Sequence, residues 1–196
     1  MRARARTIPP LRSPSAVALS ERELLEQAKA GDLEAFAEFM RTFERRVRNV
    51  LYRLLDDARD VDEAVQDTFV QAWRNLERFR GDAAPYTWLY RIAVNEALMR
   101  RRRKVLPTSE LQETMVVGGE DAFAAADVRA FLIGLLRQLP VEYRAAVVLR
   151  DVEGLSNEEV SQVLEISLAA AKSRIHRGRM QLREGLERWE DGTRNE

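Results

Sequence analysis

Residues 155–183 constrain the fold of this chain most, because they predict two helices joined by a tight turn. Ser156 precedes the first of these helices, 157–164, and Glu159 follows it at the spacing of a capping box. A short turn comes next, and a longer helix over 168–186 begins directly after it. The segment therefore predicts a helix-turn-helix unit.

The second of these helices carries charge of one sign. Between residues 168 and 183 it has no acidic residue. Its basic residues are Lys172, Arg174, His176, Arg177, Arg179 and Arg183. A basic second helix after a tight turn is typical of a unit that enters the major groove of DNA. The alternative is a solvated basic face on a helix whose apolar residues, including Leu168 and Ile175, only supply core contacts.

The turn and the second helix depart from the usual composition of such motifs. Ser167 is available as the N-cap of the second helix. Glu165 stands where Gly is frequent, and a left-handed backbone at a Glu would cost on the order of 1 kcal/mol. Gly178 lowers the helical propensity of the second helix by about 1 kcal/mol relative to Ala. These departures affect the angle of that helix more than its existence.

The composition predicts an all-α protein. The 196 residues include only 9 Gly and 6 Pro. Few segments alternate apolar and polar residues with the period of two that is typical of a strand. The absence of Cys excludes disulfides and thiolate metal sites, and the single His argues against structural zinc, so we expect no metal and no cofactor. No apolar run reaches the ~18 residues of a membrane span, and the basic start lacks a signal peptide's apolar stretch. We therefore expect a cytoplasmic protein.

The chain divides into two helical blocks. Ser20 and Glu23 repeat the capping-box spacing at the start of the first block. The net charge is zero, but the basic residues are clustered, which indicates local contacts with a polyanion. The expected organisation is a disordered basic tail 1–18, a first domain 19–104 that ends in the cationic run 100–104, a linker 105–125, a second domain 126–190 and a tail 191–196.

A second group of candidate functional residues lies in 79–95, where a loop is expected to lead into a helix. At about 100° per residue, Trp88, Arg91 and Asn95 fall on one side of that helix, while Leu89 falls on the other. Aromatic rings beside cations suit single-stranded DNA, because bases stack on the rings and phosphates bind Arg. The alternative is that the aromatic residues belong to the core.

Two segments together resemble a known family. The segment FRGDAAPYTWLYRIAVN and the preceding DVDEAVQDTFVQAWRNLERF resemble region 2 of the extracytoplasmic-function (ECF) sigma factors, the small bacterial promoter-recognition subunits of RNA polymerase. The segment LPVEYRAAVVLRDVEGLSNEEVSQVLEISLAAAKSRIHRGRMQLRE is similar to region 4 of that family. The resemblance covers about 19–190. It implies two small helical domains: a region 2 bundle and a region 4 helix-turn-helix.

The resemblance also implies a surface that binds core polymerase. The family's D-x-x-x-Q-[ED]-x-F-x-x-x-[WY] pattern docks on the clamp of the largest subunit, and region 4 binds the flap of the second largest. The polar residues of the pattern and one neighbour are expected to dock: Asp62, Gln66, Asp67 and Gln71. Phe69 and Trp73, one turn apart, are expected to pack inward.

Two DNA-binding surfaces follow from the same resemblance. The residues matching the family's capture of the melted −10 element are Phe79, Arg80, Asp82, Tyr86, Trp88, Arg91 and Asn95. Those matching the helix that reads the −35 element are Lys172, Ser173, Arg174, His176, Arg177 and Arg179. Arg144 and Arg150 are further candidates for phosphate contacts.

The expected function is that of an alternative sigma factor, which is not itself an enzyme. Its expected partners are core RNA polymerase, promoter DNA and an anti-sigma factor, and it would join the nucleoid within holoenzyme. One alternative is a stand-alone helix-turn-helix regulator that acts without polymerase. Another is a helical nucleic-acid enzyme, for which the acidic cluster around Asp56 and Glu63 offers neither His nor Cys.

Overall fold

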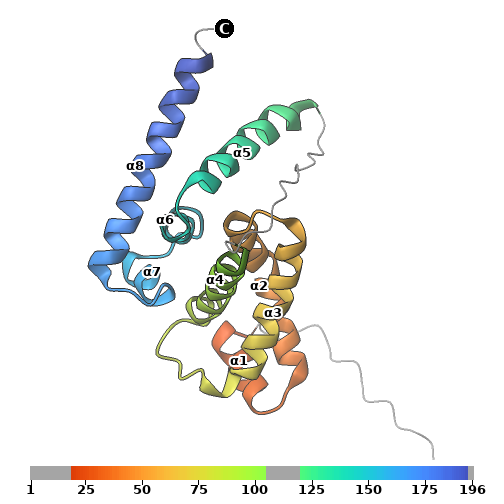
Figure 1. The fold of residues 1–196 in the computed structure, drawn as a ribbon. Coiled ribbons are helices and arrows are strands. Elements are labelled where there is room, and N and C mark those ends of the chain that lie inside the picture. Colours follow the sequence, from red (N-terminus) through yellow and green to blue (C-terminus); the bar gives the residue numbers. More distant parts are fainter. Residues whose placement is uncertain (1–18, 105–119, 194–196) are drawn as a thin grey trace, which may run out of the picture.

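The computed structural model describes residues 19–104 and 120–193, and all regular structure in these ranges is helical (Figure 1). The all-α prediction is confirmed. The first block contains α1 (Glu21–Lys29), α2 (Leu33–Leu54), α3 (Ala58–Arg74), the 3-10 turn η1 (Leu76–Arg78) and α4 (Pro85–Lys104). The second contains α5 (Glu120–Gln138), α6 (Val141–Val147), the π-helix η2 (Val148–Val152), α7 (Asn157–Val163) and α8 (Leu168–Thr193).

Helices begin where local chemistry predicts them. Ser20 and Glu23 form a reciprocal capping box at α1, and Ser156 and Glu159 form another at α7. The Ser167 hydroxyl accepts a hydrogen bond of 3.2 Å from the backbone N–H of Ala170, which caps α8 as predicted. Each cap satisfies backbone N–H groups that have no partner within their own helix.

The first domain is a bundle in which α2 packs against α1, α3 and α4. Its core is aromatic at the centre, where the rings of Phe39 and Phe43 lie 4.8 Å apart and are fully buried. Leu89 and Val94 bring the inner side of α4 into this core. The opposite side of α4 is thereby turned outward, away from α2 and α3.

The second domain is organised around the contact of α6 with α8. Ala171 and Ile175 of α8 are buried there beside Ala145 and Val148. Gly178 explains how closely the helices approach, because a Cβ atom at this position would lie 2.5 Å from Cγ2 of Val147. The low helical propensity of Gly178 is thus offset by tight helix packing.

Three boundaries differ from those expected. Helix α5 begins at Glu120, within the segment predicted as a linker, because this Ala-rich sequence with acidic residues at its start favours a helix. Helix α8 continues past residue 186 to Thr193, and the ring of Trp189 contacts Phe131 of α5 at 4.7 Å. The sequence predicts a single helix over 141–152, but α6 ends at Val147 and the π-helix η2 follows it. The predicted tail 1–18 and residues 105–119 lie outside the described residues.

The two domains touch each other. Helix α7 lies against α4, and α2 contacts both α5 and α6 (Figure 1). The outward side of α4 therefore faces the helix-turn-helix.

Candidate functional site

The loop before α4 is held by two cations of the first domain. The Nζ of Lys29 donates a hydrogen bond of 2.6 Å to the carbonyl of Phe79 and lies 5.1 Å from the centre of its ring. The guanidinium of Arg22 donates to the carbonyl of Gly81, which has a left-handed φ of 78°. The loop that carries Arg80 is therefore fixed in place, with the side chain of Arg80 exposed.

The residues of this loop and of α4 that are predicted to capture DNA differ in their exposure. Phe79 and Trp88 are buried, with ring centres 5.2 Å apart, so they support the loop. Asp82 and Asn95 are exposed, and Arg91 is half-buried. The assignment of these residues to −10 DNA stays a prediction.

A pocket of about 270 Å³ opens beside α4. Asp82, Trp88 and Arg91 line it from the first domain, and Gln162 of α7 lines it from the second. Thr87 also lines it, and its buried hydroxyl oxygen makes no hydrogen bond within the described ranges. Thr87 is not among the residues predicted from the sequence, although its place directly before Trp88 in segment 79–95 was a usable signal.

The basic residues of α8 are mostly exposed. Lys172, Ser173 and His176 face solvent, while Arg174 is half-buried. Arg177 Nη1 donates to the hydroxyl oxygen of Tyr143 at 3.2 Å. This row of donors on one face of α8 can contact phosphates and the edges of bases.

Arg179 differs from the other basic residues of α8 described above, because its guanidinium is paired with a carboxylate. Its Nε donates to Asp151 Oδ2 at 3.0 Å, and the hydrogen bond to Asp151 raises the pKa of the guanidinium. The pair fixes Arg179 against the end of η2. Its charge is partly neutralised by the same carboxylate.

Arg144 and Arg150 do not have the positions expected of phosphate ligands. Arg144 is 0% exposed, and its guanidinium binds the carbonyls of Leu54 and Leu139 at 3.3 and 3.4 Å. Burial lowers its pKa to about 10, so it stays charged at neutral pH. Arg150 is half-buried and donates to the carbonyl of Leu155 at 2.6 Å. The prediction for Arg144 is therefore wrong, because the folded chain uses it as an internal donor.

The four residues predicted to bind polymerase lie on α3. Asp62, Gln66 and Gln71 are exposed, and Asp67 is half-buried. Asp62 pairs with Arg48 of α2. Asp67 pairs with Arg100 of α4, which also binds Glu63 at 2.9 Å and Glu96 at 2.8 Å. Burial alone would lower the pKa of Arg100, but these three carboxylates raise it well above its usual value.

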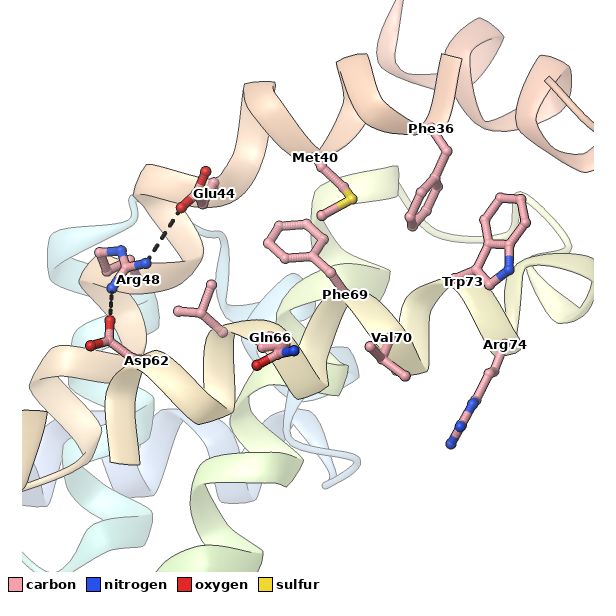
Figure 2. Close-up of a pocket in the computed structure, with 11 residues that line it drawn as sticks. Phe36, Met40, Glu44, Arg48, Asp62, Gln66, Phe69, Val70, Trp73 and Arg74 are labelled. Carbon is pink, nitrogen blue, oxygen red and sulfur yellow. Dashed lines mark hydrogen bonds and ion pairs between the residues drawn. The ribbon is translucent and has the colours of Figure 1, made fainter. Parts of the chain in front are cut away.

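A groove of about 480 Å³ runs beside these residues, between α2 and α3 (Figure 2). Its floor is apolar, with Met40 and Phe36 of α2 facing Phe69 and Val70 of α3 (Figure 2). Asp62 and Gln66 lie on its wall, so the groove is continuous with the predicted docking residues.

Trp73 lies at one end of this groove. Phe69 is buried as predicted, but Trp73 is 40% exposed, so the prediction that both pack inward is wrong for Trp73. The centre of its ring lies 4.9 Å from that of Phe36, near the start of α2 (Figure 2). An exposed Trp beside an apolar groove favours a protein contact.

Two further features concern the part of the chain that the structure describes. None of its helices is long and apolar enough to cross a membrane. Within the same ranges, no cluster of His, Asp or Glu side chains is placed to hold a metal ion.

Comparison with protein families assigns both domains. The family model "Sigma-70 region 2" matches residues 39–105, and "Sigma-70, region 4" matches residues 132–182. A region 2 domain followed by a region 4 domain is the organisation of a sigma-70-type sigma factor.

Comparison with individual relatives identifies the subfamily of sigma factors to which the chain belongs. The chain is 30% identical to the RNA polymerase sigma-H factor of Pseudomonas aeruginosa, over 85% of this chain and 94% of the relative. It is 33% identical to the ECF RNA polymerase sigma-E factor of Escherichia coli K12, over 82% and 91%. Among solved structures, CnrH in complex with the cytosolic domain of CnrY matches with a TM-score of 0.67 and 28% identity, over 85% of this chain and 97% of CnrH. The chain belongs to the ECF sigma factors and is an alternative sigma factor of transcription initiation.

Proposed function

We propose that this sigma factor binds core RNA polymerase through α3 and the adjoining groove, captures the melted −10 strand on α4 and reads the −35 duplex with α8. The observation that carries the proposal is the presence of two polar and cationic helix faces, one on each domain, beside a separate apolar groove. Each surface suits a different ligand.

The α8 surface suits duplex DNA. An exposed helix face with Lys172, Arg174 and Arg177 fits the major groove, where a bidentate Arg–guanine pair contributes about 1–3 kcal/mol of discrimination. The remaining cations would bind phosphates and add affinity that does not depend on sequence.

The α4 surface suits an unpaired base. The pocket beside Arg91 has a buried Thr87 hydroxyl and the carboxylate of Asp82 as hydrogen-bonding groups. Asn95, further along the helix, offers both a donor and an acceptor. Because opening a base step costs a few kcal/mol, capture of the flipped base stabilises the open duplex.

The docking surface suits a helical partner with an apolar ridge and basic flanks. The acidic residues Asp62 and Asp67 lie beside an apolar floor that ends at Trp73. We assign this surface to the clamp of the largest polymerase subunit and assign region 4 to the flap of the second largest.

A protein inhibitor is also part of the proposal. CnrH was solved with the cytosolic domain of CnrY bound to it. By analogy, an anti-sigma factor would hold this chain inactive until a signal releases it. The chain would act in the cytoplasm, at the nucleoid when in holoenzyme, and would not itself catalyse a reaction.

Run-off transcription tests the proposal. Purified bacterial core polymerase would transcribe genomic fragments with and without the protein, and the 5′ ends would be mapped. New starts that share two upstream elements are expected. Binding to duplex DNA without new starts, despite assembly with the core, would instead favour a stand-alone regulator.

A further inference from the structure

The outward side of α8 has a different composition from its edges. Ala171, Ile175 and Gly178 are buried and mark the inner side of this helix. The exposed residues on the opposite side, at about 100° per residue, are Ala169, Ser173, His176, Arg177 and Met180. Arg177 is the one arginine in this set. The centre of the surface that would face DNA thus offers a single guanidinium.

The other cations of α8 lie towards its edges. By the same rotation of about 100° per residue, Lys172 and Arg179 fall on one edge and Arg174 falls on the other. When a helix lies in the major groove, its edges run beside the two phosphate backbones, so edge cations meet phosphates first. Arg177 is therefore the arginine of α8 that is best placed to reach the edge of a base.

Arg177 is held by a side chain of another helix. Its Nη1 donates a hydrogen bond of 3.2 Å to the hydroxyl oxygen of Tyr143, which lies on α6. This bond uses one of the five N–H groups of the guanidinium, so two neighbouring N–H groups remain for the O6 and N7 atoms of a guanine. A free arginine loses rotamer freedom when it binds, and an arginine that is already held loses less.

Gly178 brings the tyrosine within reach of Arg177. A Cβ atom at Gly178 would lie 3.3 Å from the carbonyl oxygen of Tyr143 and 3.5 Å from its Cβ atom. Because Gly178 has no side chain, α8 packs directly against the backbone of Tyr143. The half-buried side chain of Tyr143 then reaches the residue next to Gly178. The close packing of the two helices and the hydrogen bond to Arg177 thus belong to one arrangement.

A pocket of about 400 Å³ adjoins this pair. Glu142 and Tyr143 line it from α6, and Ser173, Arg174 and Arg177 line it from α8. A phosphate that entered the pocket would meet the carboxylate of Glu142, and like charges repel each other. The edge of a base carries donors as well as acceptors and has no net charge. The surroundings of Arg177 therefore favour a base over a phosphate.

We infer that Tyr143 is a positioning residue for recognition of the −35 element: its hydroxyl holds the guanidinium of Arg177 in the orientation that contacts a guanine. A residue outside α8 thus helps to set the preferred promoter sequence. The inference rests on the proposed function of α8. Tyr143 acts through Arg177 without touching a base, so its effect is confined to the base pair that Arg177 contacts and disappears when Arg177 is removed.

Base preference at each promoter position measures this role. A promoter mapped by run-off transcription would be randomised at its upstream element, and the transcripts made from each template by core polymerase with the full chain would be counted by sequencing. Arg177→Ala should abolish the preference for guanine at one base pair. Tyr143→Phe removes a single oxygen atom and should reduce that same preference by roughly fivefold, with the other positions unchanged. It should have no further effect in an Arg177→Ala background.

The matched control is Asp151→Asn, which removes the partner of Arg179, an arginine at the edge of α8. This variant should change initiation by a similar factor on all templates and keep the preference at the base pair of Arg177. An unchanged preference in Tyr143→Phe would overturn the inference, and so would a loss spread over many positions or one that persists without Arg177. If the unmodified protein shows no upstream preference, or if Arg177→Ala alters none, the proposed function of α8 is itself rejected.

Discussion

At the scale of single residues, Gly178 sets how closely α8 approaches α6. A methyl group there would lie 3.3 Å from the carbonyl oxygen of Tyr143 as well as against Val147. Neither the backbone of α6 nor the β-branched Val147 can move easily. The position therefore needs the residue with no side chain, even in the middle of a helix.

Gly178→Ala is expected to destabilise the protein by about 1–3 kcal/mol through overpacking, although Ala favours a helix by about 1 kcal/mol. Gly134→Ala is the matched control, because a Cβ atom on α5 at that position would contact nothing within 4 Å. The control should be more stable than the unmodified protein. Urea unfolding followed by circular dichroism measures both, and equal shifts would contradict the packing argument.

Glu165→Gly should stabilise the second domain. The substitution removes a left-handed Glu, which is worth about 1 kcal/mol, and part of this gain is offset by the greater freedom of Gly in the unfolded chain. It also removes the ion pair with Arg91. The thermal midpoint should therefore rise. A lower midpoint would show that the ion pair outweighs the backbone strain.

The role of a residue was predictable from the sequence where its partners are close to it along the chain. It was not predictable where the fold brings distant partners together. The roles of Ser20 and Ser156 depend on residues three positions away, so their caps are confirmed. The burial of Arg144 depends on the end of α2, some ninety positions earlier, which no local pattern reveals. The environment of Trp73 is also tertiary, because its ring contacts Phe36 of α2 and is still 40% exposed.

At the scale of helices, the groove between α2 and α3 borders the core and is the surface proposed to bind core polymerase. Trp73→Ala is expected to weaken binding to core polymerase by about tenfold or more, because a partly exposed Trp beside a groove often dominates an interface. Trp189→Ala is the matched control, since Trp189 is 46% exposed and lies on α8. Fluorescence anisotropy with labelled core would measure both. Equal losses would contradict the assignment of the groove.

The contribution of the α7 N-terminal cap to the stability of the protein should decrease as the pH is lowered. The hydrogen bond from Tyr86, followed by those from Ser156, lowers the pKa of Glu159, so its ionised form is favoured in the folded chain. Stability from this group is present above its unfolded pKa and is lost as pH falls through the lowered folded pKa. Melting curves of the unmodified protein and of Glu159→Gln should therefore converge as pH falls from 7 towards 3. A difference that does not change with pH would contradict this role.

The helices themselves were largely predictable, while their ends were not. The spacing of Phe39, Phe43 and Val47 predicts α2, and the structure buries all three. The start of α5 was missed because acidic and small residues are common both in linkers and at the beginning of helices. The π-helix was missed because its hydrogen bonds depend on how α6 meets the turn that follows it.

At the scale of the whole molecule, Arg144 joins the two domains into one unit. Arg144→Met would leave the carbonyls of Leu54 and Leu139 without this donor and should destabilise the contact between the domains by about 2–3 kcal/mol. Unfolding should then split into two calorimetric transitions. Arg150→Met is the control, because Arg150 binds a carbonyl within its own domain and should leave one transition. A single, merely lowered transition for Arg144→Met would contradict its role as the link.

The π-helix η2 has a consequence for how insertions and deletions would act on this chain. A π turn accommodates one residue more than an α turn, and the N–H of Glu153 here bonds to the carbonyl of Val148 at 3.0 Å. Removing one residue from 148–152 would restore α-helical spacing and rotate everything that follows by about 100°. Glu153 would then turn away from Tyr90. The orientation of the helices after η2 relative to the first domain thus depends on one residue of helix length, and a one-codon deletion would break the hydrogen bond from Tyr90 to Glu153.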